Sequence, residues 1–208
     1  MMEQMKPMDI EKRSFAIITE LLGERTLPPE NELVIKRVIH TTADFDYVDN
    51  LAFSDHAVEK GIAALRAGCD IVTDTQMAKA GINKSILASL GGEVHCFMSD
   101  ADVAAEAKAR GVTRAFVSME RAAALEKPCI FAIGNAPTAL FSLEALMETS
   151  KLHPALIIGV PVGFVNVVES KERIMEAAAA PYIVARGRKG GSNVAAAICN
   201  AMLYQIRR

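Results

Sequence analysis

The stretch from Cys129 to Met147, CIFAIGNAPTALFSLEALM, shows the pattern from which the fold can be inferred. It begins with a short apolar run, which is typical of a buried strand, and continues into a segment with helical patterning. Between the two, Gly134 and Asn135 form a junction, and Pro137 suits the first turn of a helix. The stretch therefore predicts a strand that leads directly into a helix.

This strand-and-helix pattern recurs along the chain. Further apolar runs of strand length lie at residues 70–74, 93–97, 155–160 and 181–186. Segments with helical patterning follow them, among them residues 99–111, 169–178 and 191–206. Buried β-branched runs that alternate with helices of about 10–15 residues indicate a parallel sheet with helices on both faces. We therefore predict a three-layer, Rossmann-like α/β fold with a mostly parallel sheet, in a single domain of residues 1–208.

The first part of the chain contributes elements outside this alternation. Three helices and one short strand are expected, at residues 9–22, 30–40, 54–68 and 51–54 respectively. Asp9 can cap the first helix, and Ser54 with Asp55 can begin the third, which Gly68 ends.

Length and charge narrow the class of protein. A chain of 208 residues is long enough for one domain with a full core, and 51% of its residues are hydrophobic. The formal net charge is −2 and Trp is absent, so no nucleic-acid partner is expected. We find no secretory signal and no apolar run of about 20 residues, so no membrane segment is expected. The expected location is the cytoplasm.

The cysteines and the known metal motifs give no sign of a metal site. Four cysteines lie far apart without CxxC spacing, at Cys69, Cys96, Cys129 and Cys199. We expect buried, reduced thiols rather than a disulfide framework or a zinc site. Spacing such as HExxH is also missing, so no metal site is predicted.

Three glycine-containing loops follow expected strands, at the edge where ligands of parallel α/β sheets gather. They comprise residues 134–137, 159–163 and 186–192. In the last loop, GRKGGS brings two basic residues to the start of a helix, where backbone N–H groups can bind an anion. The alternative is that these glycines only make tight turns. The patterns GxGxxG, GxxxxGK[S/T] and GxSxG are absent, which argues against common nucleotide motifs and a nucleophile elbow.

The segment KRVIHTTADFDY, residues 36–47, is the strongest candidate for chemistry. Arg37 and His40 are three residues apart, so on a helix they share a face. Arg37 can hold a substrate carboxylate while His40, a residue type with an ordinary pKa of about 6.5, exchanges a proton. Asp44 or Asp46 can tune the histidine. From the residues alone, a structural role for His40 stays open. The other histidines are expected to be structural or solvated: His56, His95 and His153.

Several segments, spread in order over nearly the whole chain, resemble the precorrin-8 methylmutases of cobalamin (corrin) biosynthesis. They are SFAIITE at 14–20, KRVIHTTADFDY at 36–47, IVTDTQMAKAGINK at 71–84, AIGNAPTALF at 132–141, IGVPVGFV at 158–165 and GRKGGSNVAAAICNAML at 187–203. Two of them, KRVIHTTADFD and GRKGGSNVAAAI, are most similar to the cobalt-precorrin-8 members of the family.

The resemblance implies an isomerase that moves a methyl group from C-11 to C-12 of (cobalt-)precorrin-8 and gives cobyrinate or hydrogenobyrinate. It implies no cofactor, and it implies a homodimer that can hand its product to the next corrin enzyme. The family's catalytic histidine falls on His40, which we predict to donate a proton to the macrocycle. The predicted substrate-binding residues, placed around a tetrapyrrole polycarboxylate, are Ser14, Arg37, Thr41, Asn135, Arg188, Lys189 and Ser192.

The chain departs from the family pattern in two places. It has GFVNVVES where the family often has GFVGAAES, so Asn166, Val167 and Val168 enlarge side chains there. The segment after Arg114 also differs, which puts a ligand role for Arg114 in doubt. Two alternative functions stay open. One is a corrinoid carrier that delivers product, and the other is a cytosolic α/β enzyme acting on a smaller polyanion such as a sugar phosphate.

Overall fold

One mostly parallel sheet runs through the middle of the molecule. The computed structural model describes residues 7–207, and within them six strands pair in the order β1-β6-β5-β4-β2-β3. The strands are β1 (Leu51–Phe53), β2 (Asp70–Thr73), β3 (Val94–His95), β4 (Cys129–Ile133), β5 (Leu156–Gly159) and β6 (Tyr182–Ala185). Only the edge strand β1 is antiparallel to its neighbour; the other pairs are parallel. This confirms the predicted α/β fold class.

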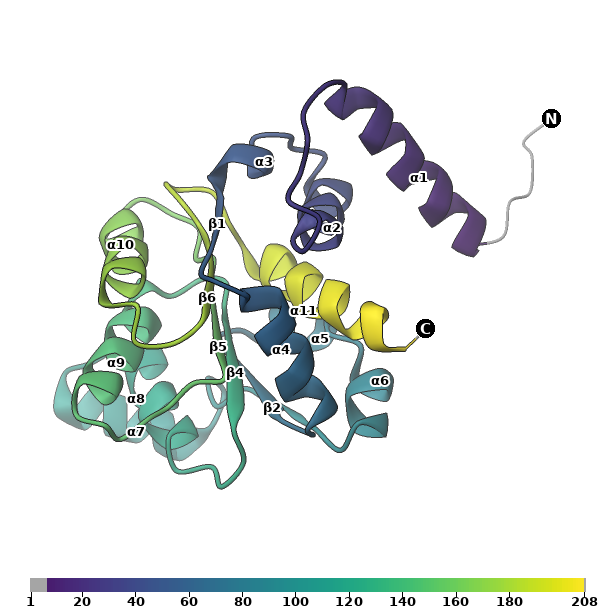
Figure 1. The fold of residues 1–208 in the computed structure, drawn as a ribbon. Helices are drawn as coiled ribbons and strands as arrows, with labels where there is room; N and C mark the ends of the chain where they lie inside the picture. Colours follow the sequence, from purple (N-terminus) through teal and green to yellow (C-terminus); the bar gives the residue numbers. More distant parts are fainter. Residues whose placement is uncertain (1–6, 208) are drawn as a thin grey trace.

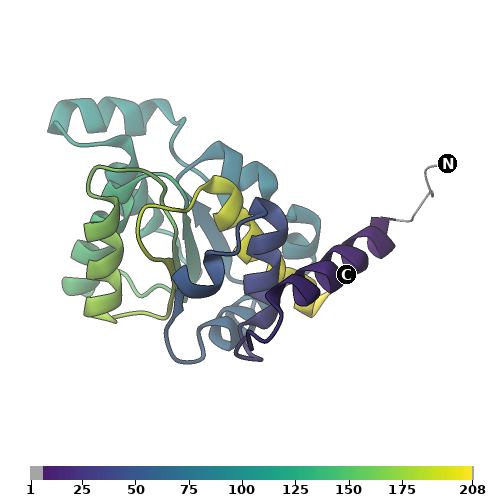
Figure 2. The ribbon, with the colours of Figure 1, turned by 90° about the horizontal axis from the view of Figure 1, so that it is seen from above.

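Helices cover both faces of the sheet and make the three layers visible in Figure 1. One face carries α7 (Ala101–Arg110), α8 (Arg114–Ala122), α9 (Pro137–Glu148) and α10 (Val167–Ala177). The other carries α2 (Glu32–Thr42), α4 (Ala57–Arg66), α5 (Gln76–Gly81), α6 (Lys84–Ser89) and α11 (Ser192–Ile206). The short α3 (Tyr47–Asn50) leads into β1, while α1 (Pro7–Leu22) contacts α2 and projects from the body (Figure 2).

Strand β4, which was predicted from the apolar run that begins at Cys129, lies between β5 and β2 inside the sheet. Every residue of β4 is buried, because helices cover both faces. Its side chains alternate between two cores: Ile130 and Ala132 pack on the α11 side, and Phe131 and Ile133 pack on the α9 side. Pro137 occupies the first turn of α9, as predicted.

Several predicted boundaries need correction. Asp9 lies in the first turn of α1 rather than at its cap, because the helix already begins at Pro7. The helix expected at residues 54–68 begins only at Ala57, since the Ser54 hydroxyl accepts a hydrogen bond from the Tyr182 N–H across the sheet edge. The strand expected at residues 93–97 is only two residues long.

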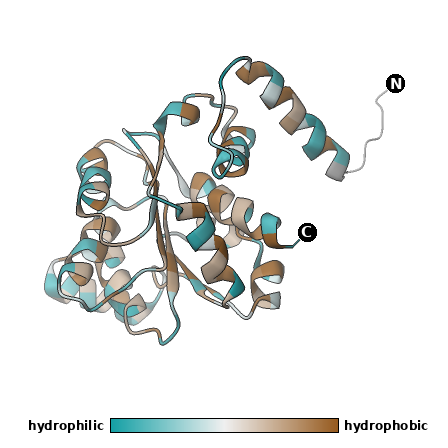
Figure 3. Cartoon of the chain, viewed as in Figure 1, coloured by the Kyte–Doolittle hydropathy of each residue, from teal (hydrophilic) through white to brown (hydrophobic). Residues whose placement is uncertain are grey.

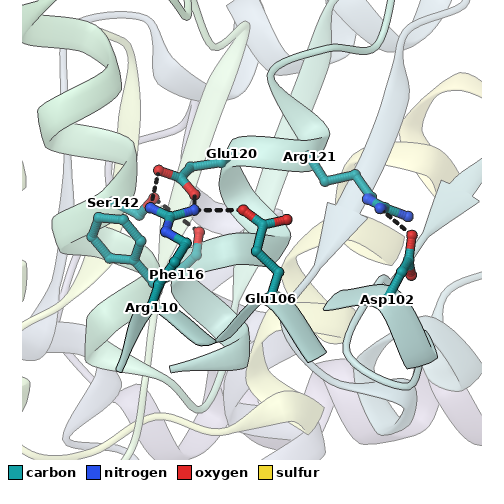
Figure 4. A network of polar contacts seen from close by, with 7 residues as sticks. All are labelled: Asp102, Glu106, Arg110, Phe116, Glu120, Arg121 and Ser142. Atoms are coloured by element: carbon teal, nitrogen blue, oxygen red, sulfur yellow. Dashed lines mark hydrogen bonds and ion pairs between the residues drawn. The ribbon is translucent and has the colours of Figure 1, made fainter. Parts of the chain in front are cut away.

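Helix α8 was not predicted, although its start carries a recognisable signal. The Thr113 hydroxyl accepts a hydrogen bond from the Phe116 N–H and so caps the helix. Two surface ion pairs then join α8 to α7, Arg110 with Glu120 and Arg121 with Asp102, while Arg110 also binds Glu106 within α7 (Figure 4). Such exposed pairs add little to stability, so the buried faces of these helices hold them to the sheet.

The cysteine side chains are all buried and free. Burial raises the pKa of Cys69 and of Cys199 to about 12, so both stay protonated at neutral pH. Between residues 7 and 207, no helix combines the length and the hydropathy that crossing a bilayer demands.

Candidate functional site

His40 lies in the last turn of α2, where its side chain is exposed. Its Nδ1 atom is 2.7 Å from the Ser14 hydroxyl oxygen, which comes from the projecting helix α1. The Phe15 ring meets the imidazole edge-on, with 5.7 Å between ring centroids. Two residues predicted for the site, Ser14 and His40, are therefore in direct contact although 26 positions separate them in the chain.

The contact with Ser14 decides which ring nitrogen of His40 is free for chemistry. When the serine hydroxyl donates to Nδ1, the hydrogen of a neutral imidazole lies on Nε2. When the ring is protonated, Nδ1 donates to the hydroxyl and Nε2 again carries hydrogen. The protonated ring therefore has Nε2–H free to donate a proton to a bound molecule, whereas the neutral ring can offer only a hydrogen bond there.

Arg37 lies one turn before His40 and is only 8% exposed. Its guanidinium lies between the rings of Phe15 and Tyr204, at 5.0 and 5.1 Å from their centroids, and forms an ion pair with Glu11. Its Nε atom has no hydrogen-bond partner among the described residues. Because Glu11 already matches its charge, the expected binding of a substrate carboxylate by Arg37 stays a prediction.

A hollow of about 340 Å³ opens between α2, α5 and α11 beside these residues. Its lining consists of Arg37, His40, Thr41, Gly81, Asn193, Ala196, Ala197, Asn200 and Tyr204. Small residues let the helices approach closely here: a Cβ added to Gly81 would lie 2.9 Å from the Ala196 Cβ. The Thr41 hydroxyl donates to the Arg37 carbonyl, which leaves its oxygen as an acceptor toward the hollow.

Asp74, directly after β2, holds the loop that begins α9. Its buried carboxylate accepts hydrogen bonds from the N–H groups of Gly134, Asn135 and Ala136 at 2.8, 2.8 and 2.6 Å. Burial raises the pKa of the Asp74 carboxyl, and the three donors act in the opposite direction. The backbone of Asn135 is thus fixed while its side chain stays exposed. Sequence analysis missed Asp74, although an acidic residue directly after a buried strand is a visible signal.

The 187–191 loop is tied to the segment that follows α2. The Lys189 ammonium lies 2.6 Å from carboxylate oxygens of both Asp44 and Asp46. These aspartates were expected to tune His40; in the structure they bind Lys189, which lowers the pKa of Asp44. Substrate binding by Lys189 stays a prediction, and any new anion would compete with the two carboxylates for its charge.

The other predicted residues at this edge have different surroundings. Arg188 is exposed, with its guanidinium carbon 6.0 Å from the centre of the Phe164 ring. The Ser192 hydroxyl is 2.8 Å from the hydroxyl of Thr75, so it links α11 to the start of α5. Substrate binding by both residues remains a prediction.

The departures from the family pattern have local structural roles. Asn166 adopts a left-handed conformation, with φ of 58°, immediately before α10, and asparagine tolerates this conformation better than most residues. Val167 is buried in the adjacent helix, so its larger side chain fills the core instead of lining a ligand edge. Arg114 begins α8, on the sheet face opposite α2 and α11.

Sequence analysis also missed Lys171 in α10. Its side chain is fully buried, and its ammonium donates to the carbonyl oxygens of Gly187 and Lys189. No spacing rule connects a lysine in one helix to the carbonyl groups of a loop 16 residues later.

Comparison with known proteins assigns the chain to a family. A family model described as precorrin-8X methylmutase matches residues 9–205. The chain is 49% identical to a cobalt-precorrin-8 methylmutase of Salmonella typhimurium, with 97% of each chain covered. It is 41% identical to a precorrin-8X methylmutase of Pseudomonas aeruginosa, with 93% of each covered. The crystal structure of precorrin-8x methyl mutase from Thermus thermophilus superposes with a TM-score of 0.85 at 38% identity, over 94% of this chain and 96% of that one. Sequence and fold agree, and the chain therefore belongs to the precorrin-8X methylmutase family.

Proposed function

We propose that this protein catalyses the isomerisation of cobalt-precorrin-8 by moving a methyl group from C-11 to C-12 of the macrocycle. Relatives named cobalt-precorrin-8 methylmutase support this substrate, and a relative named precorrin-8X methylmutase makes metal-free precorrin-8 the comparison substrate. The observation that carries the proposal is the Ser14–His40 pair at the rim of a hollow. It supplies a proton donor and needs no cosubstrate, as an isomerisation requires.

In the proposed mechanism, the protonated imidazole of His40 donates its Nε2 proton to the conjugated macrocycle beside the migrating methyl group. The proton draws electron density from the conjugated system, which lowers the barrier for breaking the C-11–methyl bond as the C-12–methyl bond forms. After migration the proton returns to His40, so reactant and product have the same composition. A positioned acid contributes about 10²–10⁴-fold to a rate, and holding the substrate in a reactive geometry contributes further.

The carboxylate arms of the substrate give the remaining predicted residues their role. We assign Arg188 to an ion pair with one arm, because its guanidinium is exposed and has no carboxylate partner among the described residues. Thr41 offers its hydroxyl oxygen to the hollow, and we assign the Asn135 amide and the Ser192 hydroxyl, which lie outside its lining, to other arms. Charge-assisted hydrogen bonds of this kind are the strongest that a polycarboxylate can form.

We also propose that the protein acts as a homodimer. Helix α1 projects from the body and carries hydrophobic residues along its length (Figure 3). Ile10, Ile17 and Leu21 are 54%, 42% and 66% exposed, and their spacing places them on one stripe of the helix. A hollow of about 340 Å³ is at the small end for a drug-sized ligand, so it covers only part of a tetrapyrrole. A second copy seated on this stripe would bury it and enlarge the enclosure beside α1.

The test is conversion of each substrate, followed by the visible spectrum. We would compare wild type, His40→Ala and, as a control, His153→Ala, which removes an exposed histidine far along the chain. We expect wild type and the control to convert cobalt-precorrin-8, and His40→Ala to lose at least about 10²-fold in rate. Full activity in His40→Ala would contradict the acid role.

The same experiment separates the enzyme from a carrier. Tight binding of the corrinoid by wild type and by His40→Ala, with conversion by neither, would identify a carrier and refute the proposed catalysis. For the enzyme, we propose direct hand-over of a tightly held product to the next corrin enzyme, in the cytoplasm. A product that dissociates faster than the enzyme turns over would contradict the hand-over.

A further inference from the structure

A buried ammonium group lies behind the glycine-rich loop at residues 187–191. Lys171 has no exposed surface, and its Nζ donates to the carbonyl oxygens of Gly187 at 2.9 Å and Lys189 at 2.8 Å. Lysine is among the residues least often buried without an ionic partner. Among the described residues no carboxylate pairs with it, and burial lowers the pKa of Lys171 to about 8. Burying the Lys171 ammonium therefore costs free energy, and the hydrogen bonds to the Gly187 and Lys189 carbonyl groups are the contacts that compensate it.

The two contacts determine where the neighbouring N–H groups point. The peptide bonds of the described residues are all trans, so the N–H of each peptide is directed opposite to its C=O. The carbonyls of Gly187 and Lys189 point at Lys171. The N–H groups of Arg188 and Gly190, which belong to the same two peptides, must then point away from it. Neither of these N–H groups donates a hydrogen bond within the described part of the chain.

The rest of the loop is fastened to the end of β5. The N–H of Gly191 donates to the Val160 carbonyl at 2.9 Å, and the N–H of Gly163 donates to the Arg188 carbonyl at 3.2 Å. A Cβ at Gly190 would overlap the Val160 carbonyl oxygen, so the backbone is packed directly on this strand end. The loop is therefore held from two sides, and it presents two unused donors.

The same loop also contacts the segment that follows α2, the helix that carries His40. Helix α10, which supplies Lys171, covers one face of the sheet, and α2 and α11 cover the other (Figure 1). Away from Lys171, the loop meets the α2 side through Lys189, which reaches Asp44 and Asp46.

Resting on the function proposed above, we propose that Lys171 is a positioning residue, which orients the 187–191 loop so that the Arg188 and Gly190 N–H groups bind one carboxylate arm of the tetrapyrrole. Lys171 itself does not touch the substrate. Anion binding by backbone N–H groups of this loop was expected from its sequence; the new element is Lys171, which acts from behind these groups.

Kinetics of Lys171→Met, which keeps the length of the side chain but removes its charge, test this role. We expect KM for cobalt-precorrin-8 and the Kd for the product to rise at least about tenfold, with kcat within about threefold of wild type. Lys171→Arg, which restores a donor cation, should recover part of the affinity. The controls are Ser170→Ala, a buried neighbour bonded only within its own helix, and Lys60→Met on the exposed surface of α4. An unchanged KM and Kd in folded Lys171→Met would overturn the proposal.

Amide hydrogen exchange tests the loop without relying on catalysis. In Lys171→Met, the peptide that covers residues 186–192 should exchange at least about tenfold faster than in wild type, while the two controls leave it unchanged. Adding product to wild type should slow the exchange of this peptide, and adding it to Lys171→Met should slow it less. Unchanged exchange in the variant would refute the positioning role even where wild type proves inactive. Failure of wild type to convert substrate, together with faster loop exchange in the variant, would refute the proposed function alone.

Discussion

Two buried charged residues, Asp74 and Lys171, bind backbone groups instead of each other. Asp74 accepts three N–H donors at the start of α9, and Lys171 donates to two carbonyl groups of the 187–191 loop. Buried charges are costly unless hydrogen bonds compensate them. Both charges stand behind loops at the carboxyl edge of the sheet, so their effect is to fix the backbone that borders the candidate site.

For Lys171, the lowered pKa gives stability a defined pH dependence. The unfolded chain keeps this proton up to the ordinary value of 10.5, whereas the folded chain releases it near 8. Between these values the unfolded state binds more protons, so this residue makes the free energy of unfolding rise with pH, by about 3 kcal/mol in total. Urea unfolding of wild type and Lys171→Met from pH 7 to 10.5 would measure it. Parallel curves for the two proteins would contradict the prediction.

For Asp74, replacement by asparagine should destabilise the fold. The amide NH₂ of asparagine would face N–H donors and leave at least one of them buried without an acceptor. We expect the free energy of unfolding to fall by about 2 kcal/mol. Denaturant unfolding measures the effect, with Asp102→Asn as the control, because Asp102 is exposed and its contacts are an ion pair with Arg121 and a hydrogen bond from the adjacent Val103 N–H (Figure 4). Equal stability of the two variants would show that the three contacts of Asp74 contribute nothing.

For Ser14, removal of the hydroxyl should weaken catalysis less than removal of His40. The hydroxyl orients the imidazole through one hydrogen bond, which is worth about 0.5–1.5 kcal/mol. Ser14→Ala should therefore lower kcat by at most about tenfold. Initial rates with saturating cobalt-precorrin-8 provide the measurement, and Ser14→Thr should retain most of the activity. A loss as large as that of His40→Ala would mean that the hydroxyl takes part in the chemistry itself.

At the scale of elements, the hollow depends on how closely α5 approaches α11. Helix α11 presents a run of alanines, and Gly81 at the end of α5 packs against Ala196. The Asn200 side chain in α11 accepts from the Asn83 N–H and donates to the Gly81 carbonyl, both at 2.8 Å. Helix α11 thus sets the position of the α5–α6 connection, and with it one wall of the hollow.

Replacing Gly81 by alanine should therefore act against the usual trend. Alanine normally stabilises a helix relative to glycine by up to about 1 kcal/mol. Here the added methyl group would lie 2.9 Å from the Ala196 Cβ, so we expect a net destabilisation of about 1–3 kcal/mol. Thermal and denaturant unfolding would measure it, with the exposed Ala80→Leu as the control. A more stable Gly81→Ala would show that the two helices can separate freely.

At the scale of the whole molecule, α1 carries the surface that we propose as the homodimer interface. It contributes Ser14 and Phe15 to the site, and Ile18 and Leu22 anchor it to the core. A second stripe of α1, with Ile17 and Leu21, stays exposed. Exposed apolar stripes of this kind commonly mark interfaces.

Charges on this stripe should therefore dissociate the proposed homodimer. We expect wild type to sediment as a dimer and Ile17→Glu/Leu21→Glu to sediment as a monomer, with a reduced affinity for the corrinoid. Val112→Glu, at an exposed position between α7 and α8, is the control and should stay dimeric. Analytical ultracentrifugation provides the measurement. A monomeric wild type, or a variant that stays dimeric, would contradict the proposed interface.

The sequence by itself determined the fold class, most of the strands and the long helices of this protein. Local periodicity carries this information: the buried run at β4 and the capped helix that ends at Gly111 both follow from the spacing of apolar, capping and glycine residues. The resemblance in KRVIHTTADFDY and GRKGGS also indicated the family, which the comparisons confirm. Short elements such as α8 and the exact helix starts were missed, because there tertiary contacts compete with weak local signals.

Only the tertiary structure decided which polar groups meet. Ser14 reaches His40 across 26 positions, Asp74 reaches Gly134 across 60, and Lys189 reaches Asp44 across 145. Periodicity tells which side of a helix or strand is buried, but not which atoms of another element lie opposite it. That depends on how whole helices and strands pack. The sequence therefore identified His40 as a candidate, whereas the packing determined that Ser14 contacts it and that Lys171 lies buried behind the 187–191 loop.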